Sequence, residues 1–119
     1  MKRVISNSTQ NVYAMANLDA KNTGLKCIIW VDSLGARRNG KHSQLRVKLE
    51  QGKYSASVLV SDNPVILAQT NNIPHSVEAN FKDAMKYIAR NSDLLLDHYY
   101  NKLTDADLMF ALKERGELK

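Results

Sequence analysis

This chain of 119 residues has little cysteine and proline and no long apolar run, and each shortage excludes a class of protein. Its single cysteine, Cys27, cannot form an intrachain disulfide or supply a metal site that needs two thiolates. We interpret Cys27 as a small buried hydrophobe rather than an activated thiol. With only two prolines, the composition does not fit a collagen-like chain or a proline-rich disordered chain. The longest apolar run covers residues 27–31, whereas a membrane-spanning helix needs about 20 residues.

The remaining composition is typical of a globular domain. Hydrophobic residues make up 44% of the chain and charged residues 24%, and the length suits a single domain over residues 1–119. The N-terminal Met1-Lys2-Arg3 is followed by mostly polar residues, where a signal peptide would have an apolar core. We therefore expect an unexported, cytoplasmic protein with no membrane association.

Net charge is +5 and is distributed unevenly along the chain. Residues 1–60 contain ten Lys and Arg and three Asp and Glu, a balance of +7. Residues 61–119 contain seven Lys and Arg and nine Asp and Glu, a balance of −2. A surface built mainly from the first half would attract phosphate groups or an acidic protein.

The first part of the chain, residues 1–70, is predicted to be rich in strands. Apolar residues alternate with polar or mixed residues over residues 25–32, 44–50 and 54–61. The last two segments are joined by Gln51-Gly52, which predicts an antiparallel hairpin. Residues 12–16 and 65–69 add two shorter strands. We therefore predict an antiparallel meander of four or five strands.

The second part, residues 75–116, changes to helical spacing. Ser92 is expected to cap a second helix, and Thr104, with Asp107 at the third position, a third helix that ends at Gly116. The fold class is therefore α+β, with two or three C-terminal helices packed on one face of the sheet and the other face partly exposed. Five apolar residues recur at spacings that place them on one face of the first helix: Val77, Phe81, Ala84, Met85 and Ile88.

Four segments of the chain, in order, resemble a small bacterial family of unknown function. They read KHSQLRV at 41–47, YSASV at 54–58, VILAQTNNIP at 65–74 and NSDLLL at 91–96, and the likeness covers roughly residues 25–100. The family has a histidine-rich strand followed by a hairpin and a helix, and its two histidines would fall on Gln44 and Arg46. Its members often occur in toxin–antitoxin-like gene pairs. The resemblance therefore implies a protein partner and a bacterial or phage setting.

Positive charge is concentrated in a loop and on the outward side of the predicted hairpin. Arg46 and Lys48 lie two positions apart on a strand and so point the same way, and the planar guanidinium of arginine suits phosphate and carboxylate groups. An ordinary solvated strand face would give the same pattern. Trp30 is expected either to pack under the helices or to offer a stacking surface. The predicted partner-binding residues are Arg37, Arg38, Lys41, Arg46 and Lys48, with Trp30 or Tyr54 as an aromatic anchor.

No catalytic, metal or cofactor site is predicted. His42, His75 and His98 lack the spacing of metal ligands, and a general base would need a nearby nucleophile that the sequence does not show. Asp93 and Asp97 lie four residues apart and could hold a divalent cation on one helix face. Their position near a helix N-terminus is explained more simply by the helix macrodipole.

These observations favour a non-enzymatic interaction protein in a bacterial or phage regulatory, toxin–antitoxin or defence context. It would bind an acidic protein or a nucleic acid through the basic loop and hairpin, and a homodimer is a further alternative. Two other functions stay open. One is a nucleic-acid-binding module without catalysis, and the other is a small RNase-like toxin in which His42, Arg46 or His98 performs acid–base work on RNA.

Overall fold

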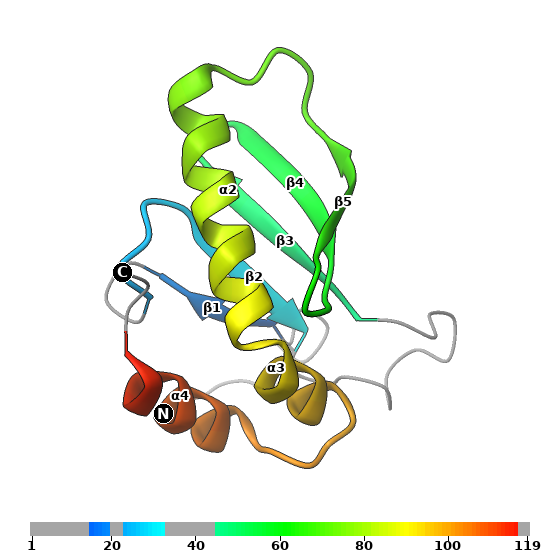
Figure 1. The fold of residues 1–119 in the computed structure, drawn as a ribbon, viewed down its shortest axis with the longest axis vertical. Coiled ribbons are helices and arrows are strands. Elements are labelled where there is room, and N and C mark those ends of the chain that lie inside the picture. Colours follow the sequence, from blue (N-terminus) through cyan, green and yellow to red (C-terminus); the bar gives the residue numbers. More distant parts are fainter. Residues whose placement is uncertain (1–14, 20–22, 33–44, 117–119) are drawn as a thin grey trace, which may run out of the picture.

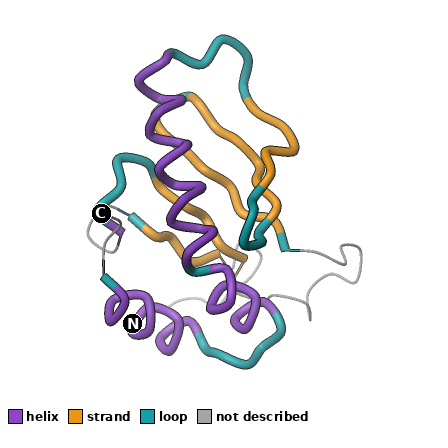
Figure 2. Tube along the Cα trace, viewed as in Figure 1, coloured by secondary structure: helices purple, strands orange, loops and turns teal. Residues whose placement is uncertain are grey.

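The structure is a computed structural model that describes residues 15–19, 23–32 and 45–116. These residues form one antiparallel sheet and three helices, which confirms the predicted α+β class (Figures 1 and 2). In chain order the elements are β1 (Met15–Leu18), β2 (Ile28–Asp32), β3 (Arg46–Gln51), β4 (Tyr54–Leu59), β5 (Val65–Gln69), α2 (His75–Arg90), α3 (Ser92–Tyr99) and α4 (Asp105–Arg115).

The sheet is a meander in which each strand pairs with the next strand along the chain. Its spatial order is β1-β2-β3-β4-β5, and every pair is antiparallel. The β3–β4 hairpin closes through Gly52 and Lys53, between the paired residues Gln51 and Tyr54. Gly52 has a φ of 61°, which glycine adopts without strain, so the sequence supports this tight connection. β1 overlaps the predicted strand at 12–16, whose first three residues lie outside the described part of the chain.

One face of the sheet forms the core together with α2. Alternate residues of the strands are buried on this side, because successive side chains of a strand point to opposite faces. Helix α2 crosses the face diagonally and buries its apolar stripe against it (Figure 1). The residues that pack together at this contact include Ile29, Val47, Leu49, Val58, Phe81, Ala84 and Ile88.

Helices α3 and α4 pack at the C-terminal end of α2 (Figure 1). The predicted cap of α3 is wrong: Ser92 is its first helical residue, and the cap position belongs to Asn91, whose buried side chain instead donates from Nδ2 to the Tyr87 carbonyl at 3.0 Å. The predicted capping box of α4 is confirmed. The Asp107 backbone N–H donates to Thr104 Oγ1 at 3.1 Å, and the Thr104 N–H donates to Asp107 Oδ2 at 3.3 Å.

The other face of the sheet points away from α2. Trp30 lies on this face, between the buried neighbours Ile29 and Val31, so the expectation that it packs under the helices is wrong. The physical reason is the alternation of β2, which turns Ile29 and Val31 to the core and leaves Trp30 on the opposite side. Among the described helices, none is long and apolar enough to cross a membrane.

Candidate functional site

The face of the sheet opposite α2 brings together three of the predicted partner-binding residues. Trp30 on β2 pairs with Lys48 on β3, and Arg46 lies two positions from Lys48, so the three side chains share one side. Arg46 and Lys48 are exposed and Trp30 is half-buried. Ser57 of β4 continues the row, since it pairs with Lys48. We call the surface formed by these four residues and the neighbouring Glu50 the open face.

Glu50 links the aromatic and basic groups of the open face. The Trp30 Nε1–H donates to Glu50 Oε1 at 2.8 Å, and Lys48 Nζ lies 4.0 Å from Glu50 Oε2. A charged acceptor makes the indole hydrogen bond stronger than one between neutral groups, and this bond fixes the orientation of the ring. The open face therefore presents apolar, positive and negative groups side by side.

A shallow hollow lies next to this row, over β4 and β5. It has a volume of about 340 Å³, and Lys48, Ser55, Ser57 and Ala68 are among its lining residues. The Ser55 hydroxyl lies 3.4 Å from Thr70 Oγ1. An ammonium group beside a hydroxyl can bind a carboxylate or a phosphate, so the hollow extends the chemistry of the open face.

The remaining predicted partner-binding residues are not part of the described open face. Arg37, Arg38 and Lys41 lie outside the described residues. Tyr54 lies on the other side of the sheet, because it pairs with Gln51, whose Oε1 accepts a hydrogen bond from Asn80 of α2 at 2.9 Å. Of the two aromatic anchors suggested by the sequence, only Trp30 shares a face with Arg46 and Lys48.

The His98 side chain is buried and makes a hydrogen bond to a carboxylate. Its position in the sequence did not indicate this. Its ring is 1% exposed, and Nε2 lies 2.6 Å from Asp105 Oδ1. With the carboxylate accepting, the Nε2–H is the donor, and Nδ1 is buried without a hydrogen-bond partner among the described residues. Arg46 lies on the open face, so the structure does not bring it together with His98. His42 lies outside the described residues.

The carboxylate of Asp93 binds an arginine. Arg115 Nη1 and Nη2 donate to Asp93 Oδ1 and Oδ2, each at 2.7 Å, and this pairing lowers the pKa of the Asp93 carboxyl to about 2. The pair links the first turn of α3 to the last turn of α4. Within the part of the chain that the structure describes, no three His, Cys, Asp or Glu side chains are grouped to hold a metal ion.

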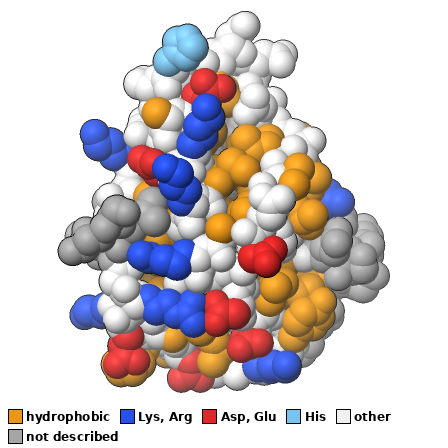
Figure 3. Space-filling view, in the orientation of Figure 1, with side chains coloured by type: hydrophobic (Ala, Val, Ile, Leu, Met, Phe, Trp, Pro, Cys, Tyr) orange, Lys and Arg blue, Asp and Glu red, His pale blue; other side chains and the backbone are white. Residues whose placement is uncertain are grey.

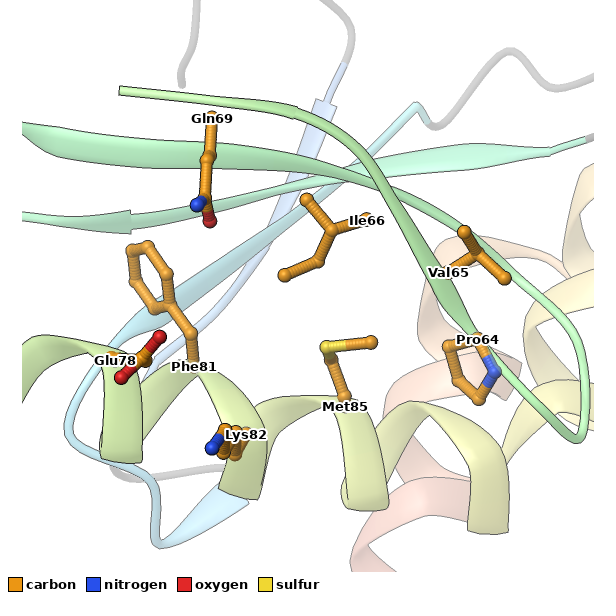
Figure 4. Close-up of a pocket in the computed structure, with 8 residues that line it drawn as sticks. All are labelled: Pro64, Val65, Ile66, Gln69, Glu78, Phe81, Lys82 and Met85. Atoms are coloured by element: carbon orange, nitrogen blue, oxygen red, sulfur yellow. The ribbon is translucent and has the colours of Figure 1, made fainter. Parts of the chain in front are cut away.

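A second concave surface lies between β5 and α2, and sequence reasoning missed it. It is a groove of about 420 Å³ (Figure 4). In space-filling view, hydrophobic side chains gather in it beside a row of charged side chains on α2 (Figure 3). We call it the β5–α2 groove. Its lining residues are Pro64, Val65, Ile66 and Gln69 from the β5 side and Glu78, Phe81, Lys82 and Met85 from α2.

The signal for this groove in the sequence is weak. Val65, Ile66 and Leu67 are consecutive apolar residues at the sheet edge, and Val65 and Leu67 are 49% and 44% exposed. A run of consecutive apolar residues predicts a strand that is covered on both faces. The exposure of Val65 and Leu67 is therefore the opposite of the prediction. A β-bulge opposite Ser57 and Val58 shifts the register of β5, which no residue pattern revealed.

Comparison of the chain with known protein families, with curated proteins and with solved structures finds no match.

Proposed function

We propose that this chain is a non-enzymatic interaction protein that binds an acidic protein through the open face of its sheet. The observation that supports the proposal is that the half-buried Trp30 and the exposed Arg46 and Lys48 share the sheet face opposite α2. A rigid aromatic ring flanked by cations is the composition of an interface hot spot, since Trp and Arg dominate such sites. We further propose a cytoplasmic setting in a bacterial or phage regulatory, toxin–antitoxin or defence system.

Glu50 favours a protein over a nucleic acid as the partner. Its carboxylate lies between Trp30 Nε1 and Lys48 Nζ, where it would repel a phosphate backbone and offset part of the positive charge. A protein surface can supply both a carboxylate for Arg46 and a donor for Glu50.

A second candidate function is single-stranded nucleic-acid binding without catalysis. The half-buried indole of Trp30 beside Lys48 favours it, because bases stack on aromatic rings while lysine contacts phosphate. The two candidates differ in salt dependence: binding through phosphate contacts weakens steeply as salt rises. A second copy of this chain, in a homodimer, is a further candidate for the partner.

The test uses the double variant Arg46→Glu/Lys48→Glu, with Lys102→Glu/Lys113→Glu as a control that makes the same charge change on exposed residues of the helical half. Each protein is immobilised and exposed to nuclease-treated and untreated host lysate. We expect a protein to bind the wild type and the control, with or without nuclease treatment, but not the Arg46→Glu/Lys48→Glu variant. The thermal unfolding temperature of this variant should equal that of the wild type. Loss of the bound material on nuclease treatment would support single-stranded nucleic-acid binding instead. Equal capture by both variants would refute the proposed use of the open face.

A further inference from the structure

The sheet has more helix-side surface at β5 than its own helices cover. Five strands spaced about 4.8 Å apart span about 19 Å, whereas one helix with its side chains is about 10 Å wide. Helix α2 packs on β3 and β4, and α3 packs on α2 and α4. The strip over β5 is left as the β5–α2 groove.

The groove has an apolar floor and a charged rim. Phe81 and Met85, four residues apart on α2, face Ile66 of β5 across the floor (Figure 4). Glu78 and Lys82, also four residues apart, form a row beside them on the same helix. The groove therefore runs along α2 and could bind a helix aligned parallel or antiparallel to α2.

Helix α4 presents a matching surface on the outside of the same molecule. Leu108 and Leu112 are buried and hold α4 to the rest of the domain. Phe110, on the opposite side of the helix, is 66% exposed, the highest value among the exposed large hydrophobic residues of the described chain. Because Leu108 and Leu112 fix α4 in this orientation, Phe110 points away from its own domain.

Two acidic residues next to Phe110 are opposite in charge to two lysines beside the groove. Asp107 and Glu114 are seven residues apart, which is nearly two turns, so they differ by only about 20° around the helix axis. Both are exposed and lie on one side of Phe110. Lys82 on the groove rim and the exposed Lys86 one turn further along α2 supply the opposite charge.

We propose that the β5–α2 groove receives α4 of a second copy of this chain, with Phe110 inserted between Ile66 and Met85 and the acidic side of α4 next to Lys82. The contact joins two different surfaces, so two copies either exchange it reciprocally in a closed dimer or add head to tail. A contact limited to one helix and one groove is expected to associate weakly, with a Kd of about 10 µM to 1 mM.

An extended peptide fits the groove less well than this helix. A strand added to the outer edge of β5 would lie about 4.8 Å further from α2, and its side chains would leave the floor at Phe81 and Met85 unfilled. A helix seated about 8–10 Å from α2 would cover that floor.

The test measures self-association by sedimentation equilibrium up to about 1 mM, the weak end of specific binding. We expect Phe110→Ala to weaken association about tenfold or more, as truncation of a buried anchor does. Tyr100→Ala is the matched control, because Tyr100 is 51% exposed but does not belong to α4. Phe110→Ala acts on an exposed ring, so its melting temperature should be unchanged, whereas Tyr100→Ala also loses an edge contact with Tyr99 and should melt slightly lower.

A charge exchange tests which surfaces meet. Lys82→Glu and Glu114→Lys should each weaken association, and the double variant should recover most of the loss, because it restores the attraction with reversed signs. Arg46→Glu/Lys48→Glu should self-associate normally, so the outcome is independent of the open face. A wild-type chain that stays monomeric to about 1 mM, or self-association unaffected by Phe110→Ala, would overturn the proposal. Amide shifts in the groove on adding only a foreign peptide or small apolar ligand, without self-association, would overturn it as well.

Discussion

His98 Nε2 lies 2.6 Å from Asp105 Oδ1, across the connection that joins α3 to α4. The ring is buried near the end of α3, and the carboxylate belongs to the first turn of α4, where it is half exposed. Asn101, between them, has a φ of 65°, a conformation that asparagine tolerates better than most residues and that reverses the chain. The bond therefore fixes the angle at which α4 leaves α3, and with it the position of Phe110.

Removing this carboxylate should destabilise the domain. Asp105→Ala leaves the buried Nε2–H of His98 without its acceptor, and an unsatisfied buried donor costs about 1–3 kcal/mol. Urea unfolding followed by circular dichroism measures the change. Asp62→Ala is the control, since Asp62 is an exposed carboxylate in the turn before β5. Equal free energies of unfolding for the two variants would show that the His98–Asp105 bond contributes nothing.

The Asp93–Arg115 pair should give the stability a specific pH dependence. Arg115 lowers the Asp93 pKa from 3.8 to about 2, so the folded state holds this carboxylate ionised at pH values where the unfolded chain protonates it. The contribution is complete above pH 3.8 and is lost as the pH falls toward 2. Because the pair is largely exposed, its size is about 0.2–1 kcal/mol.

The measurement compares the wild type with Asp93→Asn by urea unfolding at a series of pH values. The difference between them should be constant from pH 7 to about 5 and shrink below about pH 4, since only the wild type then loses an ionised group. A difference that persists unchanged to pH 2 would contradict the assignment of the low pKa to Asp93.

Ser92 and Thr104 were both predicted as helix N-caps, but their replacement by alanine should change the stability by different amounts. Thr104→Ala removes the hydroxyl that accepts from the Asp107 backbone N–H and should cost about 1 kcal/mol. Ser92→Ala should cost much less, because the Ser92 side chain makes no capping hydrogen bond in α3. Thermal unfolding of the two variants decides the matter, and a larger loss for Ser92→Ala would restore serine as the cap.

The fold could be predicted wherever one residue pattern determined one face. Arg46 to Leu49 alternates cleanly, and Val77 to Ile88 follows the helical period, so both elements and their buried sides were predictable. Trp30 was harder, because β2 carries apolar residues on both sides and the sequence does not show which side the helix covers.

The candidate sites were less predictable, because they depend on where separate elements meet. Lys48 and Arg46 share a face by strand geometry alone, so their proximity was foreseen. The hydrogen bond from Trp30 to Glu50 depends on the register between β2 and β3, and the β5–α2 groove depends on how far α2 lies from the edge strand. Neither the strand register nor the position of α2 is encoded in a local residue pattern.

Cys27 should be unreactive in the folded protein. Burial raises the pKa of its thiol from 9.0 to about 11, which reduces the thiolate fraction about 100-fold at neutral pH, and the side chain is 2% exposed. Its Sγ lies 3.8 Å from the Asn80 carbonyl of α2, so a reagent reaches it only when α2 separates from the strands. Labelling by a thiol reagent at pH 8 should therefore follow opening of the core, at a rate that rises with urea. Asp105→Ala should accelerate labelling in proportion to its loss of stability if the core opens as one unit. Rapid labelling of the wild type without denaturant would contradict the buried position of Cys27.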